Sequence, residues 1–307
     1  MASAISVNHL VKRYGPVTAV NDISFDVAAG SLFAFLGANG AGKSTTINCL
    51  NTRLRPDGGE LEVAGHRAGK DDDAIRRAIG VVFQMSLLDP LLTVRENLLV
   101  RGRFYGITNG GNARVEELSS LVDLTSFLDR PYGTLSGGQK RRADIARALI
   151  HNPSVLFLDE PTAGLDPASR ETVWAAISNL RHESGLTVFL TTHYMQETER
   201  ADDICVIDAG SIVADGTPTI LRATYAQDEL SLTVNRIGEI RGELESGGYA
   251  VEQQADVLQV KVHSSADSLT LLKRYEADVL DFEFRHGTMD DVFLSLIGPS
   301  ATRRSEA

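Results

Sequence analysis

The stretch Gly37-Ala38-Asn39-Gly40-Ala41-Gly42-Lys43-Ser44-Thr45 decides how this chain folds. An apolar run over residues 32–36 precedes it and a helix-like run over 46–50 follows it, which gives the order strand, glycine-rich loop, helix. In that order the glycines let successive backbone N–H groups turn toward one anion, and the helix adds the positive end of its dipole. The stretch therefore predicts a phosphate site, whose binding residues are Gly37, Asn39, Gly40, Gly42, Lys43, Ser44 and Thr45.

Two side chains of this loop have specific chemical uses. Lys43 can reach the β- and γ-phosphates of a nucleotide, so we expect it to serve in both binding and catalysis. The Ser44 hydroxyl can bind Mg²⁺. The alternative is a glycine-rich turn that happens to carry a lysine, and the strand and helix around the loop argue against it.

Composition limits the class of protein. The chain has 307 residues, of which 43% are hydrophobic and 23% charged, as is typical of a globular protein with one large and one small domain. No apolar run approaches the about 18 residues that span a bilayer, and residues 1–4 lack the features of a signal peptide, so we expect a cytoplasmic protein. The net charge of -11 disfavours nucleic acid as a partner. Cys49 and Cys205 lie far apart in apolar surroundings, which predicts buried free thiols.

Strand-like and helix-like stretches alternate up to about residue 217, which predicts a mainly parallel α/β core. Residues 79–83 are a strand candidate, and apolar runs typical of buried strands occupy residues 155–158 and 186–190. Helical spacing occupies residues 90 to about 130 and 168–182.

The pattern changes near residue 225, where the order of elements becomes βαββαβ, a ferredoxin-like signature. In order, the candidates are a strand at 230–234, a helix at 236–246, strands at 249–254 and 257–262, a helix at 266–276 and a strand at 279–284. A helix over 289–296 follows, and we expect the polar tail 298–307 to be disordered. The predicted domains are therefore 1–222, with a helical subdomain at about 87–150, and 223–297.

A pair of acids forms a second motif. Asp159 and Glu160 come directly after the apolar run 155–158. Ligands of an open α/β sheet bind at the carboxyl ends of its strands, so both carboxylates should lie beside the phosphate loop. There Asp159 can hold Mg²⁺, directly or through water, and Glu160 can polarise an attacking water. An ordinary acid pair after a strand is the alternative, and the accompanying phosphate loop favours the catalytic roles.

A third motif is Ser136-Gly137-Gly138-Gln139, which precedes a helical run over 140–150. Ser136 is typical of a helix cap, and the glycines leave backbone N–H groups open to a second anion. Taken alone, this motif is equally typical of a common glycine-rich helix start.

In their order along the chain, these motifs resemble those of the nucleotide-binding subunits of ABC transporters. The likeness covers about residues 5–217 and includes Gln84, the stretches 158–162 and 164–166, and His193. It implies a P-loop NTPase fold of the ABC ATPase type, with a mixed sheet and a helical subdomain, followed here by the small α+β, ferredoxin-like domain. It also implies ATP hydrolysis with Mg²⁺.

The resemblance assigns roles to four further side chains. Tyr14 would stack on adenine, and Gln84 would bind Mg²⁺ and sense the attacking water. His193 would contact the γ-phosphate, and Asp166 would lie at a dimer interface. Each has a structural alternative: a core aromatic, an exposed polar residue after a strand, a structural histidine and a helix cap before Pro167, respectively.

Members of this family act as head-to-tail dimers, in which each ATP lies between the phosphate loop of one subunit and residues 136–139 of the other. Gly137 and Gly138 would then meet the γ-phosphate across the interface. This chain carries one set of motifs, so it would need a second copy, as a homodimer, or a paralogue. Ala38 and Gly164 depart from residues frequent in the family, but neither change removes a catalytic group.

Two stretches resemble one branch of the family. Residues 88–98 resemble exporter ATPases that pair with separate ABC-2-type membrane subunits, and residues 287–294 resemble the ending of the drug-resistance branch known from daunorubicin exporters. This implies the energy-coupling subunit of an exporter of a drug, lipid or other small amphiphile. The permease would dock on the region 85–105, with Arg95, Arg101 and Arg103 as candidate contacts, and would hold the subunit at the inner face of the cell membrane.

Other classes fit less well. An ABC protein of DNA repair would carry a long coiled-coil insertion, and a ribosome-bound translation factor would usually carry two cassettes. Neither feature is present, and the acidic balance disfavours nucleic acid. An importer subunit stays open as an alternative. The isolated His263 and His286 are expected to be structural or exposed, and residues 218–307 could dimerise, bind a regulator or brace an interface.

Overall fold

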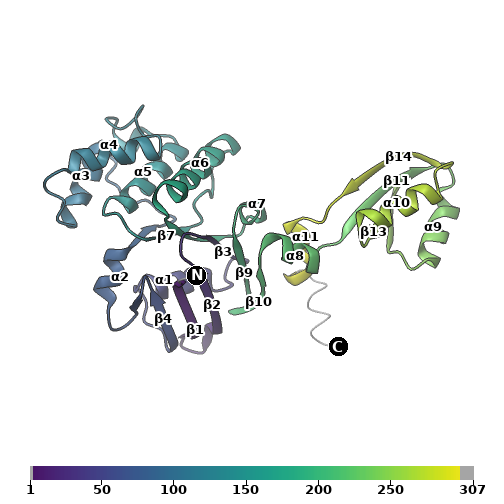
Figure 1. Ribbon diagram of the computed structural model, residues 1–307, viewed down its shortest axis with the longest axis horizontal. Coiled ribbons are helices and arrows are strands. Elements are labelled where there is room, and N and C mark those ends of the chain that lie inside the picture. The colour runs from purple at the N-terminus through teal and green to yellow at the C-terminus, as the bar shows by residue number, and fades with distance from the viewer. Residues whose placement is uncertain (1–2, 298–307) are drawn as a thin grey trace. The chain divides into compact units, whose positions relative to one another are not determined.

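The computed structural model describes residues 3–297, which divide into two units between Gly216 and Thr217 (Figure 1). The first unit holds a six-stranded sheet, a four-stranded sheet and several helices, and the second holds another four-stranded sheet with helices. Among residues 3–297, no helix has the length and apolar character needed to cross a membrane. The tail 298–307, predicted to be disordered, lies outside the described residues.

The six-stranded sheet has the strand order β10-β9-β3-β8-β7-β6. Its members are β3 (Leu32–Leu36), β6 (Ile79–Val82), β7 (Val155–Asp159), β8 (Thr187–Thr192), β9 (Asp203–Asp208) and β10 (Ser211–Gly216). All neighbours from β9 to β6 are parallel, and only β10 joins antiparallel. Parallel strands are covered on both faces, which is why they occur in the sequence as continuous apolar runs. The predicted mainly parallel core is confirmed.

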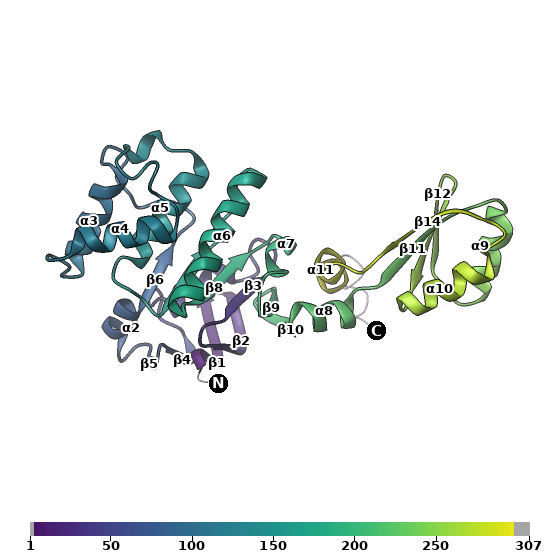
Figure 2. The same cartoon turned by 45° about the horizontal axis from the view of Figure 1, so that its top comes forward.

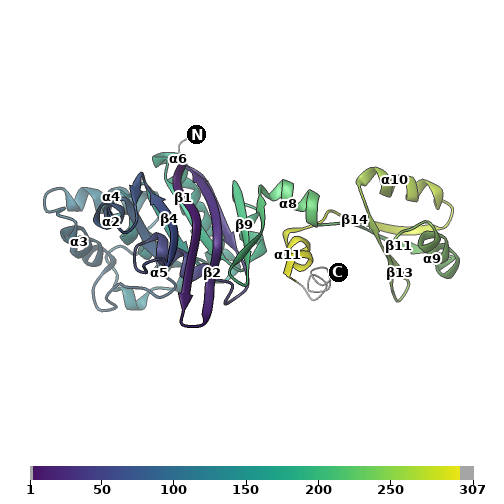
Figure 3. The ribbon, with the colours of Figure 1, turned by 90° about the horizontal axis from the view of Figure 1, so that it is seen from below.

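A second sheet of the same unit is antiparallel and packs its apolar face against the first. It has the order β2-β1-β4-β5, with β1 (Ser3–Tyr14), β2 (Val17–Ala28), β4 (Gly58–Val63) and β5 (His66–Arg67), and Figure 3 shows β1 and β2 as long paired strands. One apolar core joins the two sheets. Phe189 lies within it, fully buried, with ring centroids 5.4, 5.7 and 5.5 Å from those of Phe33, Phe35 and Phe157.

Helices of the first unit fall into two groups. The helical subdomain contains α3 (Val94–Phe104), α4 (Gly111–Leu121), a short 3-10 helix (Tyr132–Thr134) and α5 (Gly137–Leu149), within the predicted region 87–150. The other helices are α1 (Lys43–Leu50), α2 (Asp72–Ala78), α6 (Pro167–Ser184) and α7 (Met195–Thr198). Figure 2 shows α5 beside α6, and the two helices are in contact.

The second unit has the predicted order βαββαβ. Its elements are β11 (Asp228–Val234), α9 (Ile237–Ser246), β12 (Val251–Gln254), β13 (Val257–Val262), α10 (Ser265–Arg274) and β14 (Val279–Arg285), and the strands form an antiparallel sheet in the order β12-β13-β11-β14. The ferredoxin-like assignment itself stays a prediction. Helix α8 (Pro218–Tyr225), which the predicted boundary at 222 cuts, belongs to this unit because it packs against α11 (Met289–Ile297).

Replacing Phe189 with alanine should destabilise the first unit by about 3–5 kcal/mol, because the surrounding rings can close the resulting cavity only in part. Phe104→Ala is the control: that ring is 78% exposed, and its loss should change stability by less than about 0.5 kcal/mol. Urea unfolding followed by fluorescence of Trp174, the single tryptophan and a residue of the first unit, measures both. Equal effects of the two substitutions would contradict the assignment of the core.

Candidate functional site

Four neighbouring parallel strands end at one edge of the six-stranded sheet, and the predicted site residues follow their ends. These strands are neighbours in the order β3, β8, β7 and β6. Strand β3 leads into the loop 37–45, and His193 follows β8. Strand β7 ends at Asp159 and is followed by Glu160, and Gln84 comes shortly after β6. The strand registers align these ends, since Leu36 pairs with Thr192 and Asp159 with Thr191. Residues that are far apart in the sequence therefore meet at one edge, where ligands of α/β sheets bind.

Close packing fixes the loop 37–45 between neighbouring strands. A Cβ atom at Gly37 would lie 2.4 Å from the carbonyl oxygen of Ile207 in β9, and one at Gly42 would lie 2.6 Å from that of Ala19 in β2. Gly42 also has a φ of 113°, in the left-handed region, where it caps α1. Only glycine fits both positions, so the loop is held in one path against the sheet.

Lys43 is buried at the start of α1, and its ammonium group faces back into the loop. Nζ donates to the carbonyl oxygens of Gly37 at 2.7 Å and Ala38 at 3.0 Å. Burial lowers the pKa of Lys43, while the nearby carboxylates of Glu160 and Asp159 act in the opposite direction. The lysine thus lies within electrostatic reach of both acids, and an anionic phosphate would be a stronger partner than the two neutral carbonyls.

The other loop residues lie nearer to solvent. Asn39, Gly40 and Ser44 are exposed, and Thr45 is half-buried. Within residues 3–297 the Ser44 hydroxyl has no hydrogen-bond partner, so its oxygen is free to bind a metal ion.

Glu160 is held in an uncommon backbone conformation. Its φ is 47°, a left-handed value that costs a non-glycine residue about 1–3 kcal/mol. Its N–H donates to the carbonyl oxygen of Thr191 at 3.1 Å, and its Oε1 lies 3.1 Å from Nδ1 of His193. Such strain persists only where neighbouring groups fix it, and it is concentrated at functional sites. The carboxylate is therefore oriented by its own strained backbone, which follows β7, and by His193, which follows β8.

Asp159 is positioned by a residue that the sequence analysis missed. The Thr191 hydroxyl donates to Asp159 Oδ1 at 2.5 Å, and Oδ2 has no hydrogen-bond partner among the described residues. A signal for Thr191 exists, because a hydroxyl at the end of a buried apolar strand needs a partner. With Ser44 and Gln84, Asp159 offers a set of oxygen donors. Such a set suits Mg²⁺, which takes few protein ligands and keeps waters or phosphate oxygens.

Residues 136–139 form a helix start whose structural role is clear. The Ser136 hydroxyl accepts from the N–H of Gln139 at 3.4 Å, and the Ser136 N–H donates to Gln139 Oε1 at 3.1 Å, which is a capping box for α5. A Cβ at Gly138 would lie 2.8 Å from the Cβ of Ser169, so glycine is needed there for the close packing of α5 on α6. Gly137 stays exposed, and binding of a second anion at this helix start remains a prediction.

Three further predicted residues are accounted for. Asp166 caps α6: its carboxylate accepts from the N–H and hydroxyl of Ser169 at 2.9 and 2.6 Å, and these bonds lower its pKa. Tyr14, at the end of β1, is 47% exposed with Lys12 Nζ 5.7 Å from its ring, so it is not the core aromatic of the alternative interpretation. Gln84 is exposed, and its side chain makes no hydrogen bond within residues 3–297.

Comparison with known proteins places these features in a family. A model of the ABC transporter family matches residues 20–163. The daunorubicin/doxorubicin resistance ATP-binding protein DrrA of Streptomyces peucetius is 38% identical over 98% of this chain and 94% of its own length. The Nod factor export ATP-binding protein I of Burkholderia lata is 37% identical over 96% of this chain and 97% of its own length.

Solved structures agree with this placement. A dimeric post-hydrolysis state of the ATP-binding cassette MJ0796 bound to ADP and Pi is 29% identical and has a TM-score of 0.62, over 69% of this chain and 98% of that chain. CbiO1 of Clostridium perfringens, part of the ABC transporter complex cbiONQ, is 26% identical with a TM-score of 0.67, over 80% of this chain and 96% of that chain.

Proteins of this kind bind ATP with Mg²⁺, form dimers and work with a membrane permease. The chain belongs to the ABC transporter family, and it is an ATP-hydrolysing, energy-coupling subunit.

Proposed function

We propose that this subunit hydrolyses ATP in a head-to-tail homodimer, with each nucleotide between the loop 37–45 of one copy and residues 136–139 of the other. The observation that carries the proposal is the meeting of buried Lys43 with Asp159 and the His193-bound Glu160 at one sheet edge. The exposed Ser136 and Gly137 support the second half of the site, because a helix start that faces solvent can bind an anion from another subunit.

In this arrangement each residue has a distinct task. Lys43 binds the β- and γ-phosphates, and Tyr14 stacks on the adenine ring. Glu160, oriented by His193, accepts the proton of the attacking water, and the rate gain comes from positioning and electrostatics. Ser44, Gln84 and Asp159 would hold Mg²⁺, which supplies charge neutralisation at the phosphate oxygens.

The surface around residues 85–104 supports docking of a membrane partner. It exposes five large apolar side chains, namely Met85, Leu87, Leu91, Val100 and Phe104. Leu91 is 86% exposed, and an apolar surface of this kind typically marks an interaction site. Arg95, one of the candidate contacts, is bound within the chain to Glu116 at 2.5 Å and Asp129 at 2.6 Å.

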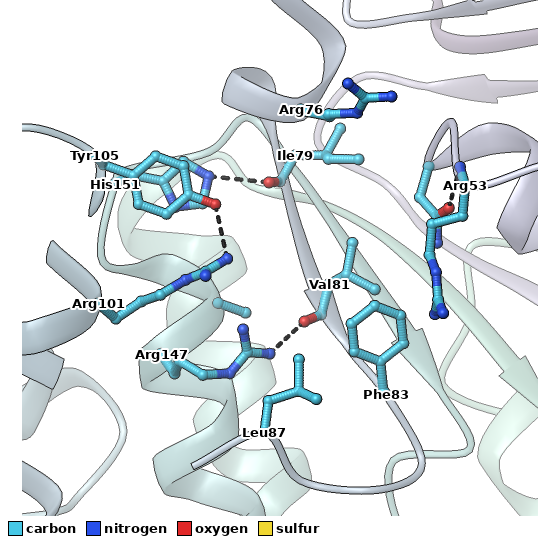
Figure 4. Close-up of a pocket in the computed structure, with 12 residues that line it drawn as sticks. Arg53, Arg76, Ile79, Val81, Phe83, Leu87, Arg101, Tyr105, Arg147 and His151 are labelled. Carbon is cyan, nitrogen blue, oxygen red and sulfur yellow. Dashed lines mark hydrogen bonds between the residues drawn. The ribbon is translucent and has the colours of Figure 1, made fainter. Parts of the chain in front are cut away.

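A cavity of about 230 Å³ adjoins this surface (Figure 4). Four arginines line it together with apolar and aromatic side chains, and its lining residues include no carboxylate; the arginines are Arg53, Arg76, Arg101 and Arg147. Burial lowers the pKa of His151, so this side chain is neutral at pH 7 and the positive charge comes from the arginines. A cytoplasmic permease segment that carries an acidic and an apolar side chain fits this chemistry.

The relatives support a class of transported compound. One is named for daunorubicin and doxorubicin resistance and another for Nod factor export, and both align with this chain over nearly their whole length. We therefore assign the subunit to an exporter of a drug-like or lipid-like amphiphile. It would act in the cytoplasm, held at the inner face of the membrane by an ABC-2-type permease. Residues 217–297 would form an accessory domain. A solute-binding protein encoded beside the gene would instead favour import.

Glu160→Gln should lower ATP turnover at least about 100-fold, since the amide cannot accept the proton, and should trap an ATP-bound dimer. Light scattering after gel filtration with and without MgATP measures the dimer. Adding Asn39→Cys and Ser136→Cys should then give a disulfide between copies. Burial raises the pKa of Cys49 to about 11 and also raises that of Cys205, so the native thiols should stay inert. A variant that stays monomeric with ATP would rule out this dimer.

Thr191→Val should raise the Mg²⁺ concentration needed for half-maximal ATPase activity about tenfold, because it removes the hydroxyl that orients Asp159. Thr187→Val is the matched control on the same strand. That hydroxyl accepts from the N–H of Gly30 at 2.9 Å, at the opposite end of β8. Each substitution should cost about 1 kcal/mol of stability, but only the first should change the Mg²⁺ titration. Identical Mg²⁺ titrations of the two variants would show that Asp159 is not part of the metal site.

Leu91→Glu should abolish co-purification with the membrane protein encoded beside this gene, while ATP binding is retained. A carboxylate on this apolar surface cannot be desolvated without a large cost. Leu269→Glu, at a site that is 57% exposed on α10, is the control and should co-purify normally. Retention of the partner by the Leu91 variant would exclude this surface as the docking site.

A further inference from the structure

One face of α5 holds the segment that leads to Gln84. Arg141, Asp144 and Arg147 are spaced three residues apart, so they share a side of the helix, and all three are buried. They bind successive points along residues 81–86: Arg147 donates to the carbonyl oxygen of Val81 at 2.5 Å, Arg141 donates to that of Phe83 at 2.7 Å, and Asp144 accepts from the Ser86 hydroxyl at 2.6 Å. The helix that begins after Ser136 is thereby tied to both sides of Gln84.

Of these three side chains, Arg141 is the one that also binds Glu160. Its other terminal nitrogen donates to the carbonyl oxygen of Glu160 at 3.3 Å. The N–H of Glu160 is bound by Thr191 and its carboxylate by His193. The remaining polar group is the backbone carbonyl, which accepts from Arg141 and also from the N–H of Ala163 at 3.3 Å. A guanidinium has fixed, coplanar donors, and one such group here spans the Gln84 segment and the strained Glu160 peptide.

We propose that Arg141 is a positioning residue for ATP hydrolysis. Its guanidinium sets the spacing between the segment that carries Gln84 and the peptide of Glu160, and it joins both to the helix of the Ser136 cap. Movement of α5 would then displace Gln84 and Glu160 together. The inference rests on the proposed roles of those two residues, and it adds a residue that acts through them.

The next residue provides a close comparison. Arg142 is 9% exposed and Arg141 is 7% exposed, so both guanidinium groups are buried on the same helix. Arg142 instead binds Asp123 within the helical subdomain and lies 5.0 Å from the Phe127 ring. If Arg141 served only to stabilise the fold, the two positions would respond alike to substitution.

The test compares Arg141→Gln with Arg142→Gln in the full chain, by steady-state ATPase kinetics and thermal unfolding. Both variants should melt at lower temperature. Arg141→Gln should lower kcat about 10- to 100-fold with KM for MgATP within about twofold of the original, because misplacement of reacting groups slows chemistry more than binding. Arg142→Gln should keep kcat within about threefold. Equal losses of kcat, or a raised KM with unchanged kcat for Arg141→Gln, would overturn the proposal.

Two further measurements keep the proposal testable. Should Arg141→Gln fail to fold, Arg141→Lys retains the charge but not the planar fork, and an unchanged kcat in that variant would refute the positioning role. Because Arg141 acts through the Gln84 segment, adding Gln84→Ala should lower kcat less in the Arg141→Gln variant than in the Arg142→Gln variant. Equal reductions of kcat would also refute the proposal. Full turnover in Glu160→Gln would instead refute the proposed catalytic roles themselves, so the two failures are distinguishable.

Discussion

The parallel pairing of β3, β8, β7 and β6 is the constraint on which the site depends. Parallel strands must end at the same edge, so the phosphate loop, His193, the Asp159–Glu160 pair and Gln84 are gathered there although they are spread over more than half of the chain. The apolar core between the two sheets keeps this edge rigid, with the Phe189 ring packed among four other phenylalanines. Catalysis by positioning requires that rigidity, because small displacements of the reacting groups are costly.

Beneath this edge, charged side chains bind main-chain groups. Arg141 and Arg147 donate to the carbonyl oxygens of Phe83 and Val81, and Asp144 lies between them and accepts from hydroxyl groups. Burying such charges is expensive unless each is compensated, and alternation of sign along the helix provides part of that compensation. A buried polar network of this kind permits few alternative arrangements, which suits a segment with a proposed positioning role.

The segment 81–91 therefore contains residues bound to α5 and residues exposed to solvent. Val81, Phe83 and Ser86 are bound to α5 by hydrogen bonds. Met85, Leu87 and Leu91 are exposed. A partner bound there would push on residues that are connected through Arg141 to Glu160 and through α5 to the Ser136 cap. This would give a short physical route between the proposed docking surface and the proposed hydrolytic site, with both ends lying within the first unit of the chain.

The sequence determined the features that depend on neighbouring residues. The phosphate loop, the acid pair and the caps at Ser136 and Asp166 follow from local spacing, and the parallel core follows from apolar runs. Tertiary structure alone decided that Thr191 holds Asp159 and that Arg141 binds two separate segments. It also decided that Gly138 allows α6 to pack closely on α5, that Arg95 is bound within the chain, and that α8 belongs to the second unit. Each of these depends on contacts between residues 19 to 60 or more positions apart, which no local pattern encodes, since a side chain's partner across the fold is set by how whole elements pack.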